Sequence, residues 1–313
     1  MDTAGPETSC PKCGAPRIDG PECPRCGVFY AKAARRPLPA AAEVPAELLP
    51  LDDPPPASPP FDDEARFELR LRCFVLPAAL VGAWLVMHAP VLRMLGRIFL
   101  SMWVHELGHA VTAWLCGISA FPGPWVTSVG ESRSGMVSVL VLGACGLIAY
   151  RAWKERRGTI LAIAAAAVSA HLLGSLGLRL ETALAWVTFG GDAGCMVLGT
   201  LLMASFYAPR DSQIYQGALR WGFLVIGAVS FADVFETWWA ARTDVDRIPF
   251  GQNEGVGLSD PSKLTDVYGW TIPQLIDRYV TLGLLCLLAL AVVYALGLWS
   301  ASRRGDVARP SSR

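Results

Sequence analysis

Seven long apolar runs dominate the chain from residue 67 onward and restrict what it can fold into. A helix that crosses a bilayer needs about 20 mostly apolar residues, a length that Met136–Tyr150 does not reach and the other six runs do. The runs are Cys73–Val91, Ile98–Ile118, Met136–Tyr150, Thr159–Leu178, Thr182–Phe206, Leu219–Ala241 and Tyr279–Trp299. We therefore expect an all-α polytopic membrane protein with six or seven membrane segments.

Composition supports the same class. Of the 313 residues, 53% are hydrophobic and only 17% are charged, whereas roughly a quarter of the residues in a soluble domain are charged. The formal net charge is zero, which gives no reason to expect a nucleic-acid partner. We therefore expect the lipid bilayer to surround most of the chain.

The chain divides into three zones. Residues 1–31 are polar and contain four cysteines, and residues 67–313 carry the apolar runs. Between them, residues 32–66 form a linker with nine prolines from Pro37 to Pro60. Proline disfavours both helix and sheet, so we expect this linker to be extended and semi-rigid.

The four N-terminal cysteines form two C-P-x-C-G segments, Cys10 with Cys13 and Cys23 with Cys26. Four thiolates at this spacing satisfy a tetrahedral Zn²⁺ ion and leave no open position, which is typical of a structural zinc ribbon. Two disulfides or redox-active pairs are the alternatives, and both fit a cytosolic head poorly. Another protein, or a second copy of the chain, is the expected partner of this ribbon.

Basic residues in short loops indicate the cytoplasmic side of a membrane protein. If all seven runs cross, this rule places the zinc ribbon outside, where thiols tend to oxidise. If Met136–Tyr150 only enters the membrane partway, the rule places the N-terminus inside. We therefore expect six spans with one partial segment, and a cytoplasmic zinc ribbon.

The second run contains the motif H-E-x-x-H, with His105, Glu106 and His109. Residues four apart share one face of a helix, so both histidines can bind a single zinc ion, with Glu106 beside them as a proton acceptor and donor. Ionisable groups inside an apolar span are costly to bury, and they therefore indicate a functional site.

The motif within an apolar helix resembles the site-2-protease type of intramembrane zinc metallopeptidase. The rest of residues 98–299 is similar to the B-like branch of that family, with a glycine-containing loop at 129–135, an S-x-x-D-V-x-E pattern at 230–236 and the dipeptide Ser259-Asp260. The resemblance implies a catalytic zinc and a third ligand that is an aspartate from a later helix.

Two aspartates are candidates for that third ligand. Asp233 lies in the S-x-x-D pattern, and Asp192 lies in a glycine-rich stretch of another span. We predict Asp233 as the ligand and keep Asp192 as the alternative. Asp260 precedes Pro261, a position typical of a helix N-cap. His88 and His171 are expected to be packing residues. Because His171 lies within a span, where histidines are uncommon, membership of the polar site is its alternative role.

These features predict an intramembrane zinc metalloendopeptidase that cleaves membrane-embedded or membrane-proximal segments of other proteins, with one catalytic and one structural zinc. The alternative is a catalytically silent membrane scaffold that binds partners through its zinc ribbon. An ion-coupled transporter would be expected to show internal repeats, and the sequence has none that we can identify.

Overall fold

The computed structural model describes residues 9–10, 15–16, 19–30, 61–209, 212–253 and 257–307. The chain separates into two compact units, Met1–Ser58 and Pro59–Arg313, which we treat one at a time. The predicted proline-rich linker falls almost wholly outside the described residues. Its last residues, from Phe61, already belong to the first long helix, α2 (Phe61–Met87).

The larger unit is a bundle of long apolar helices, as the sequence predicts. Within the described residues, six helical stretches are long and apolar enough to cross a membrane. They are Arg66–Met87, Gly135–Lys154, Gly158–Gly177, Leu180–Tyr207, Leu219–Ala240 and Ile272–Ser302. The helices that contain them are α2, α5 (Gly135–Lys154), α6 (Gly158–Leu172) with the π-helical turn η3 (Leu173–Gly177), α7 (Leu180–Ala204) with the 3₁₀ turn η4 (Ser205–Tyr207), α9 (Leu219–Ala240) and α11 (Ile272–Val307).

The six candidate spans are not the six that we expected. The run Met136–Tyr150, predicted to enter the membrane partway, lies in the 20-residue helix α5, which continues through Arg151 to Lys154. Counting only apolar residues missed this last turn, where long basic side chains can reach water while their stems stay in the apolar layer. The expected partial segment is therefore a helix of full membrane length.

The expected span that contains H-E-x-x-H is instead divided among several short elements. It comprises the π-helical turn η2 (Arg97–Ser101), the 14-residue helix α4 (Met102–Leu115) and the first residue of strand β1 (Ile118–Pro122), after the short helix α3 (Pro90–Gly96). Strand β1 pairs antiparallel with β2 (Thr127–Arg133), with an irregularity after Ile118. Single π-helical turns inside longer helices are frequent at functional sites.

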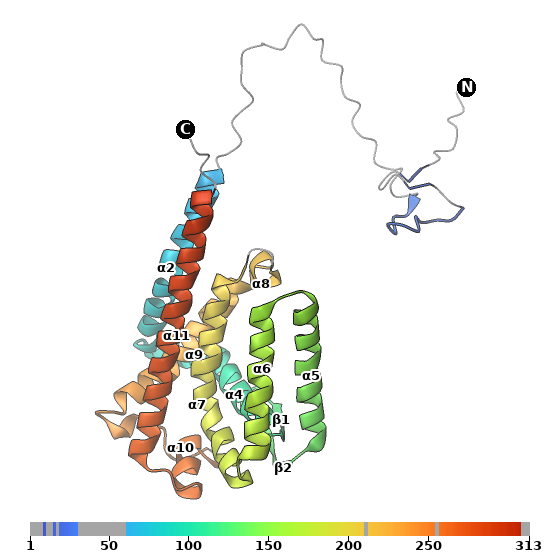
Figure 1. The fold of residues 1–313 in the computed structure, drawn as a ribbon. Coiled ribbons are helices and arrows are strands. Elements are labelled where there is room, and N and C mark those ends of the chain that lie inside the picture. Colours follow the sequence, from blue (N-terminus) through green and yellow to red (C-terminus); the bar gives the residue numbers. More distant parts are fainter. Residues whose placement is uncertain are drawn as a thin grey trace, which may run out of the picture. The chain divides into compact units, whose positions relative to one another are not determined.

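The ends of the bundle differ in what they carry (Figure 1). The first turns of α2 and the last turns of α11 lie at one end. The hairpin β1–β2 and the short helix α10 (Asp260–Ser262) lie toward the other end. The remaining elements are α8 (Gln213–Gln216), the 3₁₀ turn η5 (Val245–Arg247), the strand pair β3 (Gln252–Asn253) and β4 (Gly257–Leu258), and the π-helical turn η6 (Lys263–Val267).

Glycines allow α4 to pack directly against α7. A side-chain carbon on Gly108 of α4 would overlap the backbone of α7 at Gly190 and Gly194. This backbone-to-backbone approach brings the H-E-x-x-H face of α4 against the middle of α7, where Asp192 lies. The fold thereby forces the histidines toward the interior of the bundle.

Candidate metal centre

Two imidazoles of α4 meet at the centre of the candidate site. His105 and His109 are one helical turn apart, and their Nε2 atoms lie 3.1 Å from each other. His109 is buried and His105 is partly buried. The local prediction from the motif therefore agrees with the geometry, since both rings present the same nitrogen to one point.

The third side chain at that point is Asp260. Its Oδ2 atom lies 3.1 Å from His105 Nε2 and 3.0 Å from His109 Nε2. Tetrahedral zinc with bonds of about 2.0–2.1 Å holds its ligand atoms about 3.4 Å apart. Two imidazole nitrogens and one carboxylate oxygen are also a donor set that catalytic zinc sites use. The three side chains therefore fit a zinc ion with a fourth position left for water or substrate.

The local structure around Asp260 explains why it is available. We expected Asp260 to be a helix N-cap, but the cap of α10 is Ser259, whose Oγ accepts a hydrogen bond from the amide of Ser262. Asp260 is the first residue of α10, so its carboxylate is not used in capping and points to the histidines. Burial raises the pKa of the Asp260 carboxyl, but the charge of His109 and hydrogen bonds from both histidines hold it well below its usual range.

Asp192 lies behind His105 rather than at the ligand position. Its Oδ1 atom is 3.1 Å from His105 Nδ1, the nitrogen on the far side of the ring. Its other oxygen, Oδ2, accepts a 2.7 Å hydrogen bond from Trp238 Nε1. Metal-binding histidines commonly donate their second ring nitrogen to a carboxylate or a backbone carbonyl. His109 does so too, since its Nδ1 is 2.7 Å from the carbonyl oxygen of Val187.

Asp233, our first choice for the third ligand, does not join this group. It is buried on α9, and its Oδ1 lies 3.8 Å from Arg93 Nε and 4.0 Å from Arg97 Nη1. The face of α9 that carries Asp233 packs against α3 and η2, upstream of the histidines, and two arginines occupy its surroundings. The arrangement thus corrects the prediction: Asp260 takes the position expected of Asp233, and Asp192 supports a histidine from behind.

Glu106 is held beside the two histidines and Asp260 by the hairpin. It is only 4% exposed, and its Oε2 lies 2.7 Å from Thr127 Oγ1 in β2. The same hydroxyl lies 2.8 Å from the carbonyl oxygen of Glu106. The hydroxyl of Thr127, the first residue of β2, can therefore donate its hydrogen bond to either the carbonyl oxygen or the carboxylate of Glu106. Strand β2 thus fixes the position of the motif glutamate.

Gly191 leaves the room that the histidines need. A side-chain carbon at this position would lie 2.5 Å from both His105 Cε1 and His109 Nε2, which is closer than real contacts allow. The glycines around Asp192 thus allow α7 to approach the site and keep space for the two rings.

A cavity of about 680 Å³ contains the candidate site. His105, Glu106, His109 and Asp260 line it together with the β2 residues around Thr127. Exposed aromatic residues line it as well, Trp125 at 64% and Phe250 at 40% exposure, so the cavity reaches the surface. Arg97 and Lys263 supply positive charge along its wall, and Glu131 supplies a carboxylate.

The remaining histidines lie elsewhere. His171 is fully buried in α6, and its Nδ1 is 3.0 Å from the carbonyl oxygen of Trp114 at the end of α4. His88 bonds the carbonyl oxygen of Trp84, one turn earlier in α2. The contact of His171 agrees with the predicted packing role, whereas His88 is exposed and its bond is to the helix that precedes it.

Sequence reasoning missed two residues of the site. Asp260 had a signal, the Ser-Asp dipeptide before the last span, but its place before Pro261 favoured a capping role. Trp238 had none, because a tryptophan in an apolar run is most simply a packing residue. Its ring stacks on Tyr279 with ring centroids 4.1 Å apart, which fixes the indole that holds Asp192.

Comparisons with protein-family models, with curated proteins and with solved structures return no match. The resemblance to the site-2-protease type therefore stays a prediction, and the geometry of the candidate metal centre is the basis for the function of the chain.

Replacing Trp238 with phenylalanine should weaken zinc binding at the membrane site by about 10–100-fold, the usual cost of losing a group that orients a metal-binding histidine. Phenylalanine keeps the stacking on Tyr279 but removes the Nε1 donor to Asp192. Titration of the purified protein with a competing chelator measures the affinity. Trp239→Phe is the matched control, since that ring is exposed and lies under Arg242. Equal affinities in the two variants would contradict the positioning role.

Proposed function

We propose that the chain is an intramembrane zinc metalloendopeptidase. The observation that carries the proposal is the convergence of His105, His109 and Asp260 at one point, in a cavity that Glu106 also lines. Of the six candidate membrane spans, the one in α7 lines this cavity, through Leu184, Val187, Thr188 and Asp192. Three protein ligands with an open fourth position are typical of catalytic rather than structural zinc.

In this proposal the three ligand side chains hold the metal and Glu106 moves protons. A zinc ion bound there supplies a Lewis acid, which polarises the scissile carbonyl and makes water a stronger acid. Glu106 accepts a proton from the attacking water while the water oxygen bonds to the carbonyl carbon. As the carbon–nitrogen bond breaks, Glu106 returns that proton to the leaving amine. Thr127 keeps the carboxylate in place between the two transfers.

The proposed substrates are membrane-embedded or membrane-proximal segments of other proteins. The ligands come from α4 and α10, and α10 lies toward the same end of the bundle as β1–β2 (Figure 1). A peptide bond in a membrane helix is shielded by its own hydrogen bonds, so the segment must unwind before cleavage. Substrates therefore need to present an unwound segment at that end of the bundle.

We also propose that the N-terminus and its zinc ribbon lie in the cytoplasm. The turn between α5 and α6 lies toward the same end of the bundle as the start of α2 (Figure 1). The last turn of α5 and the loop that follows it carry four basic residues, Arg151, Lys154, Arg156 and Arg157, and Arg303 and Arg304 lie near the end of α11. Clusters of basic residues in short loops favour the cytoplasmic side.

The proposal is tested by comparing protein termini in cells that produce either the wild-type chain or His105→Ala. We expect new termini within or next to predicted membrane spans only with the wild type, because the variant lacks a metal ligand. Mass spectrometry of labelled termini detects them even though no substrate has been identified. Identical sets of termini in both cells would overturn the peptidase and favour the silent scaffold.

A further inference from the structure

The two cysteine-containing segments of the N-terminal unit are closed by matching backbone contacts. The amide of Cys10 donates to the carbonyl oxygen of Ala15 at 2.8 Å, and the amide of Cys23 donates to that of Val28 at 3.0 Å. Isolated bridges close both turns at matching positions, Ser9 with Pro16 and Glu22 with Phe29. The two C-P-x-C-G segments are therefore closed by the same hydrogen bond and the same bridge at matching positions.

The second turn is described at its glycine as well. Gly27 has a φ of +67°, which side-chain-bearing residues rarely adopt, and its amide donates to the carbonyl oxygen of Cys23 at 2.8 Å. Gly14 occupies the matching place in the first segment of the sequence. A tight reversal after the second cysteine brings two thiols of one segment to the same side.

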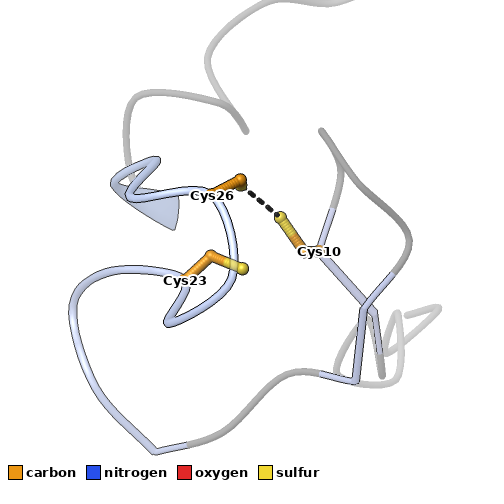
Figure 2. A group of neighbouring side chains, drawn as sticks. All are labelled: Cys10, Cys23 and Cys26. Carbon is orange, nitrogen blue, oxygen red and sulfur yellow. Dashed lines mark hydrogen bonds between the residues drawn. The ribbon is translucent and has the colours of Figure 1, made fainter. Parts of the chain in front are cut away.

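The thiols converge as zinc ligands do. Figure 2 shows Cys10, Cys23 and Cys26 gathered around one point, and their Sγ atoms all lie within 4.8 Å of one another. The Sγ atoms of Cys10 and Cys26 are 3.8 Å apart, far longer than a disulfide bond of about 2.05 Å. Tetrahedral zinc with Zn–S bonds of about 2.3 Å holds its sulfur atoms about 3.8 Å apart.

The described core of the N-terminal unit is small. Its buried residues among those described are Cys10, Ala15, Cys23 and Tyr30. The cysteine-containing part of the unit, residues 9–30, is shorter than the roughly 40 residues below which a fold usually needs a disulfide, a metal or a partner. The thiol cluster itself forms half of the described core, so a metal at its centre would stabilise this part of the unit.

We infer that the N-terminal unit holds a second zinc ion through four thiolates, independently of the membrane site. Cys10, Cys23 and Cys26 supply three of them. The sequence pattern predicts Cys13 as the fourth, and that residue lies outside the described residues. Four protein ligands leave no open position, so this zinc is structural. The inference does not depend on the proposed peptidase function.

The test measures zinc per chain in the full-length protein purified in detergent, by mass spectrometry of the metal. Cys10→Ser/Cys23→Ser should lose one zinc equivalent and keep the other, while His105→Ala should lose the other and keep this one. Cys145→Ser, in α5, is the matched control for removal of a thiol and should lose none. Retention of zinc at the membrane site also shows that the double variant has folded there.

Cobalt gives a second readout that does not depend on stability. Chains loaded with Co²⁺ should show intense sulfur-to-cobalt charge-transfer absorption in the wild type and in His105→Ala, and lose it in Cys10→Ser/Cys23→Ser. Unchanged zinc content in the double cysteine variant would overturn the inference. So would iron in place of zinc, or a chain whose four N-terminal cysteines are oxidised and free of metal.

Discussion

Replacing Asp260 with alanine should empty the membrane metal site while leaving the bundle folded. In the proposed metal site the side chain supplies one of three ligand atoms, 3.0–3.1 Å from both histidine nitrogens, so its loss leaves only two. We expect zinc affinity to fall by more than the roughly 10–100-fold that follows the loss of an orienting group, and chelator-sensitive cleavage to disappear. Zinc per chain, measured after size-exclusion chromatography, checks this.

Two control variants test whether the loss of zinc is specific to Asp260. Asp266→Ala removes a carboxylate six residues further along, whose Oδ1 accepts a hydrogen bond from Thr265, and should retain zinc. Asp233→Asn should also retain it, because that carboxylate lies between Arg93 and Arg97 rather than at the histidines. Zinc lost in Asp233→Asn and kept in Asp260→Ala would reverse the assignment.

Local features of the site could be predicted from the sequence because they depend on one helix. The spacing of His105 and His109 places both on one face, whatever surrounds α4. The all-helical membrane class follows in the same way, from run lengths alone. The repeated C-P-x-C-G segments also act locally, since each turn is closed by its own backbone hydrogen bond.

The third ligand could not be predicted because it depends on how distant segments pack. Asp192, Asp233 and Asp260 are all acidic residues downstream of the motif, and no local pattern says which of them reaches the histidines. Packing decides which aspartate reaches the histidines. Helix α7 approaches α4 through glycines and places Asp192 behind His105, whereas the packing of α9 places Asp233 against η2. The loop after α9 then carries Asp260 back to α4.

The same packing gives the two histidines different supports. His105 is held by a carboxylate, and that carboxylate by an indole, whereas His109 is held by a backbone carbonyl. A carboxylate behind a ligand makes the imidazole more basic and a stronger donor to the metal. Asp192→Asn should therefore weaken zinc binding without removing a ligand, between the effects of Trp238→Phe and Asp260→Ala.

Replacing Glu106 with glutamine should slow cleavage by at least about 100-fold and leave zinc content at the wild-type level. Glutamine keeps the shape of the side chain and can still accept a hydrogen bond from Thr127, but it cannot take a proton from water. A positioned general base contributes about 10²–10⁴-fold to such a reaction, so the rate should fall by at least that range's lower end. The rate is measured on a substrate found by comparing termini.

Glu131→Gln is the matched control, because Glu131 lines the same cavity from β2 without touching the ligand atoms, and it should cleave at close to the wild-type rate. Thr127→Val removes the hydroxyl that holds Glu106 and should slow cleavage less than Glu106→Gln does. A Glu106→Gln variant that cleaves as fast as wild type would remove the proton carrier from the mechanism. One that loses zinc would instead make Glu106 part of the metal's support, so zinc content has to be measured with every rate.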